Sequence, residues 1–219
     1  MTRVLSTKIL KPNQKQFLLN AGFSVVEADF IRTTALPFQL HDVADNLILT
    51  SQNAVNALAE HPEVQDVRRK PVFCVGHQTA DLLDEFGFTV QEIADNAKEL
   101  AEVIIKNYAA DTFTFFAGNI RRNELPLALM ESDVELNEIE VYETEPTPQK
   151  IGKFDAVLFF SPSGVQSFLS VNTLTDEMCF CIGNTTASAL EKITDSIVIA
   201  NQPSVENTII QTINYYKSS

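Results

Sequence analysis

The stretch VFCVGHQTADLL at residues 72–83 returns as CFCIGNTTASAL at residues 179–190. Each copy is a short apolar run followed by the pattern Gly–x–x–Thr–Ala. An apolar run that ends at a glycine and leads into a helix-like segment is typical of a buried strand, a tight turn and a helix. Because this unit occurs twice, the sequence predicts an α/β fold made of two similar parts.

The repeat extends beyond these turns. LTSQNAVNAL at residues 49–58 matches FSPSGVQSFL at residues 160–169, which places Ser51 opposite Ser161. NAKELAEVI at 96–104 matches PSVENTIIQ at 203–211 more weakly, and residues 3–22 overlay 113–132 only by pattern. A repeat of this length indicates two similar domains and not a solenoid.

Apolar runs that alternate with helix-like segments predict mainly parallel sheets. One helix is expected after residue 12, with Asn13 as its cap and Gly22 at its end. The matching segment MESDVEL at 130–136 lacks that glycine, which should affect only a turn. The predicted strands are residues 3–6, 24–28, 47–50, 72–75, 89–93, 112–116, 134–142, 156–160, 179–182 and 196–200.

The composition is that of a globular protein, with 45% hydrophobic and 21% charged residues in 219. No apolar run reaches the roughly 20 residues of a membrane helix, and a polar stretch follows the first strand, so a cytoplasmic protein is expected. A formal charge of −13 argues against nucleic-acid binding. Cys74, Cys179 and Cys181 lie in apolar runs, which predicts buried free thiols and no metal site.

The boundary between the two parts has two interpretations. A simple tandem would divide the chain near residues 109–111. The polar, proline-containing segments 32–38 and 143–150 look more like linkers and occupy equivalent places in the two halves. If both are crossings, the middle of the chain forms one domain and the two ends form the other.

The repeated turns suggest anion binding. Glycine allows a ligand to approach the backbone, and the first N–H groups of a helix favour negative charge. Ser51 and Asn53, and Ser161 and Ser163, also precede helices and could bind an anion. For each turn alone, helix capping is the alternative interpretation.

No familiar catalytic motif is present: the sequence has no GxSxG, GxGxxG, P-loop or HExxH pattern. An enzyme of this kind would act by positioning and electrostatics. Two other classes stay open. One is a two-lobed, non-catalytic protein that binds small anions, and the other is a signalling module of paired flavodoxin-like domains.

Taken in order, the segments LTSQNAVNAL, VGHQTADLL, NAKELA, AGNIRRNELPLAL, VYET, FSPSGVQSFL and IGNTTASAL resemble the uroporphyrinogen-III synthase family over nearly the whole chain. The resemblance implies two flavodoxin-like or Rossmann-like α/β domains with parallel sheets, joined by a two-stranded linker. One domain would be discontinuous, residues 1–33 with 143–219, and residues 34–142 would be inserted in it.

The same resemblance implies a reaction. The family closes the linear tetrapyrrole hydroxymethylbilane to uroporphyrinogen III, inverting ring D and losing water, by way of an azafulvene cation and a spiro intermediate. It implies no cofactor and no metal, a monomer, and a cleft that binds a substrate with many carboxylates.

The resemblance also implies roles for individual residues. Tyr142 matches the tyrosine of the family's VYxT segment and would donate a proton to the departing hydroxyl. Lys8, and Arg121 or Arg122, would supply positive charge. Asn53 stands where the family commonly has a cation, which puts a positive contact there in doubt. The other expected substrate-binding residues are Thr50, Ser51, Asn53, Gly76, Thr79, Ser161, Ser163, Gly164, Gly183 and Thr186.

Overall fold

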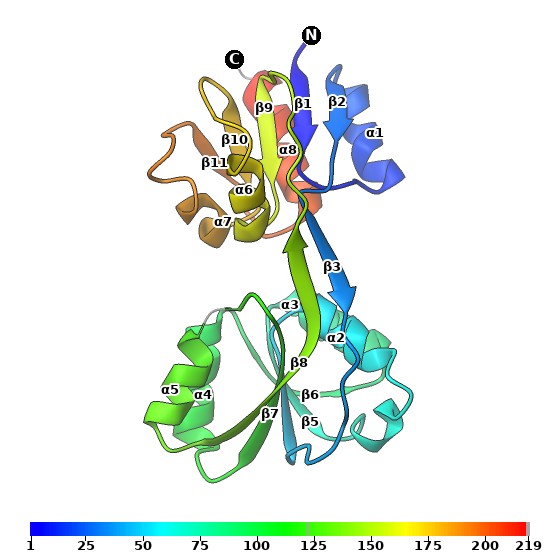
Figure 1. Cartoon of the computed structure of the whole chain (residues 1–219), viewed down its shortest axis with the longest axis vertical. Helices are drawn as coiled ribbons and strands as arrows, with labels where there is room; N and C mark the ends of the chain where they lie inside the picture. The colour runs from blue at the N-terminus through cyan, green and yellow to red at the C-terminus, as the bar shows by residue number, and fades with distance from the viewer. Residues whose placement is uncertain (122, 218–219) are drawn as a thin grey trace. The chain divides into compact units, whose positions relative to one another are not determined.

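The computed structural model describes residues 1–121 and 123–217 and divides into two compact units (Figure 1). Unit 1 is Met1–Arg32 with Glu145–Ser219, and unit 2 is Thr33–Thr144. The predicted boundaries lie one and two residues away from these; that the two units are separate domains, one discontinuous and one inserted, stays a prediction. Within the described ranges, no helix is long and apolar enough to cross a membrane.

Unit 1 contains a parallel sheet with the strand order β11-β10-β9-β1-β2. The strands are β1 (Arg3–Ser6), β2 (Ser24–Glu27), β9 (Ala156–Phe159), β10 (Met178–Cys181) and β11 (Ile197–Ile199). Helices α1 (Pro12–Asn20) and α8 (Val205–Lys217) pack on one face of this sheet. On the other face lie α6 (Pro162–Leu169) and α7 (Asn184–Ser188).

Unit 2 contains a sheet with the order β3-β8-β7-β4-β5-β6. The strands are β3 (Ile31–Ala35), β4 (Asn46–Leu49), β5 (Pro71–Val75), β6 (Thr89–Ala94), β7 (Thr112–Gly118) and β8 (Glu135–Pro146). One face packs on α2 (Gln52–Ala59) and α3 (His77–Glu85), near the 3-10 helix η1 (Val64–Asp66). The other packs on α4 (Ala97–Asn107) and α5 (Glu124–Glu131). The central strands are almost entirely buried and mostly apolar because both faces are covered.

The two sheets have the same order if the chain is read from different starting strands. Read from β4, unit 2 has the order 3-2-1-4-5, with β3 added at the edge. Unit 1 has that same order when read from β9 through the end of the chain and on to β1 and β2. In its own chain order it reads 2-1-3-4-5, the flavodoxin-like arrangement. The units are therefore cyclic permutations of one architecture.

The predicted strands are all present, with ends that coincide or shift by up to four residues. The segments interpreted as linkers are partly strand: β3 covers Arg32–Ala35, and β8 continues to Pro146. These strands are neighbours in the sheet of unit 2 and run in opposite directions, with Leu36 N–H donating to Val141 O at 3.0 Å (Figure 1). The family's two-stranded linker is thus present as paired strands.

One predicted cap is wrong. Lys11, not Asn13, is the N-cap of α1, because Pro12 takes the first helical position and the Gln14 side chain accepts the Lys11 N–H at 2.9 Å. Gly22 ends the helix as expected, with φ +87°. After α5, Asp133 takes the corresponding left-handed conformation with φ +55°, which aspartate tolerates. The turn after α5 therefore keeps its left-handed conformation, with aspartate in place of glycine.

The three cysteines are free and buried, as predicted. Burial raises the pKa of Cys179 and of Cys181 to about 12. Burial, with the charge of Asp84, raises the pKa of Cys74 to about 11. At neutral pH these thiols are protonated and act as small apolar groups.

Candidate functional site

The serine turns follow the central strands β4 and β9 and cap the next helix. Ser51 Oγ accepts the Asn53 N–H at 3.1 Å, and Ser161 Oγ accepts the Gly164 N–H at 3.0 Å. The capping alternative is therefore confirmed for these two hydroxyls. Ser163 Oγ lies 3.3 Å from Ser161 Oγ, at the same turn. Thr50, half-buried, stands between β4 and its capping serine.

The glycine turns behave differently. Gly76 and Gly183 are the N-caps of α3 and α7, and neither helix has a side-chain cap. Thr79 and Thr186 are the third residues of these helices and are 6% and 3% exposed. Among the residues that the structure describes, neither threonine hydroxyl has a hydrogen-bond partner. The capping alternative is therefore wrong for the threonines, whose hydroxyls are left for another partner.

Each unit places its serine turn beside its glycine turn. In unit 2, β4 and β5 are neighbours, and Gln52 Nε2 donates to Gln78 Oε1 at 3.2 Å across the two helix starts. In unit 1, β9 and β10 are neighbours, and α6 contacts α7. All four turns lie at the carboxyl ends of parallel strands, the edge at which open α/β sheets bind ligands.

In unit 1, β2 is added on one side of β1, and β9, β10 and β11 are added on the other side, so a topological switch point lies between the parallel neighbours β1 and β9. This switch point carries a residue that the sequence did not single out. Thr7 follows β1, is buried, and donates its hydroxyl to Leu158 O at 2.8 Å. A methyl group on Gly164 would lie 3.2 Å from Ser161 Oγ and 3.9 Å from Thr7 Oγ1. Gly164 therefore leaves room for the Ser161 hydroxyl that caps α6.

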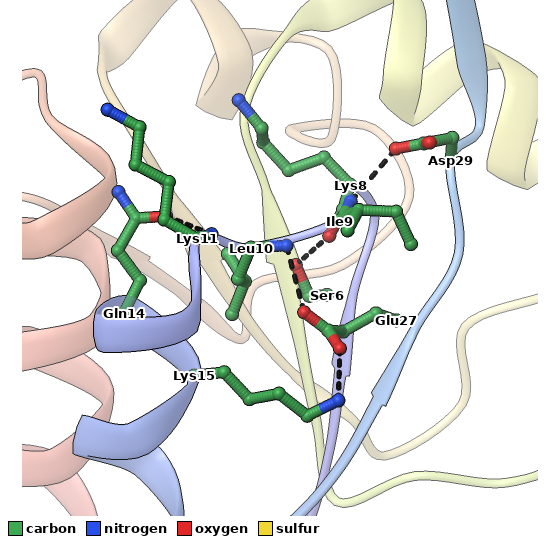
Figure 2. Close-up of polar contacts among 9 residues, drawn as sticks. All are labelled: Ser6, Lys8, Ile9, Leu10, Lys11, Gln14, Lys15, Glu27 and Asp29. Atoms are coloured by element: carbon green, nitrogen blue, oxygen red, sulfur yellow. Dashed lines mark hydrogen bonds and ion pairs between the residues drawn. The ribbon is translucent and has the colours of Figure 1, made fainter.

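Lys8 extends from the same switch point. Its Nζ lies 5.9 Å from the centre of the Phe160 ring, and Ser6 Oγ donates to its carbonyl at 2.6 Å. Figure 2 shows Lys8 and Lys11 pointing away from a third lysine, Lys15, which pairs with Glu27. Within the described chain, Lys8 and Lys11 have no acidic partner within ion-pair distance.

Acidic side chains hold this loop without neutralising its two free lysines. Glu27 Oε1 accepts the Leu10 N–H at 2.8 Å, and Asp29 Oδ1 accepts the Ile9 N–H at 2.8 Å (Figure 2). The pKa of Glu206 is lowered first by the Gln14 side chain, which donates at 2.6 Å, then by a backbone N–H and the charges of Lys11 and Lys8. In a chain of net charge −13, Lys8 and Lys11 are thus two cations of the described chain that no carboxylate pairs directly.

Tyr142 lies in β8 of unit 2, half-buried, and packs on the core cluster that includes Leu49, Ala54 and Ala80. It pairs in register with Gly118 at the carboxyl end of β7. Because β7 neighbours β4, Tyr142 belongs to the same sheet edge as the serine turn of unit 2.

Arg121 does not join these turns. Its guanidinium pairs with Glu138 of β8 and donates to Asn123 Oδ1 at 2.7 Å. These residues line a groove of about 530 Å³ along α5, together with Leu127 and Met130. Its binding role stays a prediction, and Arg122 lies outside the described residues. Asn53 is exposed and offers no charge.

A separate cavity of about 730 Å³ lies at the opposite edge of the unit 1 sheet. Its walls include Arg3, Phe154, Asp155, Glu177 and Tyr216, at the amino ends of β1, β9 and β10. None of the predicted site residues lines it. The turns at the carboxyl ends, and not this cavity, form the candidate site of each unit.

Comparison with known proteins decides the family. Residues 14–210 match the family described as uroporphyrinogen-III synthase HemD. The chain belongs to the uroporphyrinogen-III synthase family. The match begins after Lys8 and Lys11, so the family match does not cover these two lysines.

Relatives in the family are distant in sequence. The chain is 28% identical over 151 residues to uroporphyrinogen-III synthase of Saccharomyces cerevisiae, a match that spans 55% of each protein, about half the length of that relative. A crystal structure of the synthetase from Helicobacter pylori has 20% identity and a TM-score of 0.74 over 98% of this chain and 100% of that one. A crystal structure of a mutant uroporphyrinogen III synthase from Thermus thermophilus has 16% identity and a TM-score of 0.74 over 100% of both chains. At such identities, the solved structures support the fold.

Proposed function

We propose that this protein is a uroporphyrinogen-III synthase, which closes hydroxymethylbilane to uroporphyrinogen III with inversion of ring D and loss of water. Family membership over residues 14–210 is the observation that carries this proposal. The two threonine hydroxyls without a hydrogen-bond partner and the two lysines without an ion pair, all in the described chain, agree with it, because the substrate carries many carboxylates.

Binding is assigned first to the turns. The hydroxyls of Thr79 and Thr186 donate to substrate carboxylates, and both units offer the same kind of donor. Lys8 and Lys11 add positive charge in a chain that is acidic overall. Ser51 and Ser161 shape their turns by capping, so their contribution to the substrate is indirect.

The chemistry needs a leaving group and a controlled attack. Tyr142 donates its phenolic proton to the hydroxyl of the substrate, which leaves as water and gives an azafulvene cation. Attack by the substituted carbon of ring D forms the spiro intermediate, which opens and closes again with ring D inverted. The proton released when the last pyrrole regains its aromaticity returns to the phenolate. No cofactor takes part, and we expect a monomer in the cytoplasm.

The test is the isomer produced from hydroxymethylbilane. In the presence of the protein, type III product should form above the type I product of spontaneous closure, with no added metal or cofactor. Type I product alone, at the spontaneous rate, would contradict the enzyme and favour an anion-binding protein without catalysis. Light scattering at the assay concentration tests the monomer.

A further inference from the structure

Gly118 ends strand β7 in close contact with the proposed catalytic tyrosine. A methyl group built on Gly118 would lie 2.4 Å from both Cε2 and Cζ of Tyr142 and 2.9 Å from its hydroxyl oxygen. These are the three atoms nearest to that methyl group. Gly118 is not among the glycines with positive φ, so its backbone conformation is open to other residues. The tyrosine ring, and not the backbone, therefore requires glycine here.

An irregularity in the ladder turns Tyr142 toward this glycine. Along β7 and β8 the register advances by one residue at a time up to the pair Ala117–Glu140. The next pair is Gly118–Tyr142, so β8 has one extra residue, Val141, at this point. Bulges of this kind redirect a side chain. Here the bulge lays the Tyr142 ring over the glycine.

Asn119 fixes the chain at the tyrosine and just after it. Its N–H donates to Tyr142 O at 3.2 Å. Its side-chain Oδ1 accepts the Thr144 N–H at 2.8 Å, and its Nδ2 lies 3.4 Å from Thr144 O. The amide side chain thus continues the ladder past the end of β7. Gly118 therefore pairs with Tyr142, and Asn119 bonds to both Tyr142 and Thr144.

We propose that Gly118 and Asn119 are positioning residues for Tyr142: the glycine provides the space that the phenol ring occupies, and the asparagine holds β8 in the register that points the ring there. The kinetic part of this inference rests on the proposed function of Tyr142. The contact itself does not, and it can be measured separately.

The decisive variant is Gly118→Ala, with Gly152→Ala as the matched control, because a methyl group on Gly152 meets nothing within 4 Å. Gly118→Ala should lower kcat for the type III product about tenfold, with KM unchanged, as loss of the phenol would. Adding Gly118→Ala to Tyr142→Ala should cost nothing more. Full activity of Gly118→Ala, or losses that multiply in the double variant, would overturn the proposal.

A second readout separates the contact from the chemistry. The chain has four tyrosines, so 3-fluorotyrosine gives a small set of fluorine NMR signals, and Tyr142→Phe identifies one of them. Gly118→Ala should move that signal and leave the others, whereas Asn119→Asp, which keeps the acceptor for Thr144, should move it less than Asn119→Ala. An unmoved signal rejects the positioning role whatever the kinetics. A moved signal with unchanged Tyr142→Phe kinetics rejects only the acid role of the tyrosine.

If Gly118→Ala does not fold, Gly118→Ala with Tyr142→Ala decides the matter. Recovery of a cooperative urea transition in the double variant would support the proposal, because the clash has been removed. Failure of both would assign the glycine to the backbone of β7 and overturn it.

Discussion

Units 1 and 2 share one strand order but do not share a starting point, and this difference explains the repeat in the sequence. The halves of the chain meet near residue 110, whereas the compact units meet at 32/33 and 144/145. Each sheet consequently takes three of its five shared strands from one half and two from the other. Neither half of the chain contains a complete sheet of this order.

The register also identifies equivalent residues in the two units. Ser6 pairs with Leu158, and Phe115 pairs with Ile48, each three residues before a capping serine. Ser6 is therefore the counterpart of Phe115, and the residues paired to them on the next strand, Glu27 and Glu138, are also counterparts.

Each of these two glutamates forms an ion pair with a cation of its own unit. Glu27 pairs with Lys15, and Glu138 pairs with Arg121. By this comparison Arg121 holds its own unit together, as Lys15 does. Counting from Ser6 and Phe115, the counterparts of Lys8 and Lys11 are Ala117 and Ile120. At these equivalent positions, the lysines thus belong to unit 1, and the phenol of Tyr142 belongs to unit 2.

The largest effect is expected where the units are alike. Replacing both Thr79 and Thr186 by valine removes one hydroxyl donor from each unit. At about 1 kcal/mol for each hydrogen bond, KM should rise roughly 25-fold with little change in the melting temperature. Steady-state kinetics and thermal unfolding of the single and double variants check this. A fall in melting temperature with unchanged KM would show that the threonines serve only packing.

The next largest effect is expected for Tyr142, which has no tyrosine counterpart in unit 1. No tyrosine occurs in residues 24–35, which include the unit 1 strand equivalent to β8. Tyr142→Phe should lower the rate of type III formation about tenfold or more, a loss of about 1.4 kcal/mol. The measurement is the initial rate with the isomer ratio. An unchanged rate and ratio would remove the proton-donor role.

The three lysines of unit 1 sharpen the charge comparison. Lys8→Ala and Lys11→Ala should each raise KM about threefold, and the effect should shrink at high salt, since both side chains are solvated. Lys15→Ala is the matched control: it breaks the Glu27 pair and should leave KM unchanged. Equal losses in all three variants would indicate a diffuse charge effect and no specific contact.

The repeated glycines are less alike than their sequences. Gly76 has φ +81°, a conformation that costs other residues about 1 kcal/mol or more, whereas Gly183 is extended with φ −176°. Gly76→Ala should therefore lower the melting temperature by about 2–4 °C, and Gly183→Ala by less. Differential scanning calorimetry of the two variants tests this. Equal shifts would mean that both turns need glycine for the same reason.

The smallest expected effect concerns the buried thiols, two in unit 1 and one in unit 2. Burial raises the pKa from the ordinary 9.0 to about 11 for Cys74 and to about 12 for Cys179 and Cys181. As the pH rises, the thiols therefore ionise in the unfolded chain before they ionise in the folded one. Their contribution to stability is complete below pH 9 and is lost as the pH rises toward 12. Urea titrations at pH 8 and 10.5 should show a smaller pH dependence for Cys179→Ala with Cys181→Ala than for Cys74→Ala. The reverse order would contradict the assignment.

Much of the fold could be predicted because buried parallel strands are apolar on both faces. The runs at β4, β5, β9 and β10 stand out in the sequence for this reason. Strand β3 does not, since IRTTA is largely exposed and shows no apolar alternation. Its strand character comes from pairing with β8, which no local pattern reveals.

The site was predictable only as far as its turns. Serine and glycine at the ends of strands have local signals. Contacts that depend on register have none: Arg121 meets Glu138, 17 residues away, and Gly118 meets Tyr142 through a bulge. Thr7 was missed for the same reason, because its partner Leu158 is 151 residues distant.

The permuted order has a consequence for synthesis on the ribosome. Strand β1 is made first, yet its neighbour β9 begins at Ala156, so the sheet of unit 1 cannot close until the last third of the chain has emerged. All of unit 2 precedes Glu145 and can pair its strands earlier. Strand β1 thus leaves the ribosome well before its neighbour β9, and until β9 pairs with it the apolar edge of β1 stays exposed.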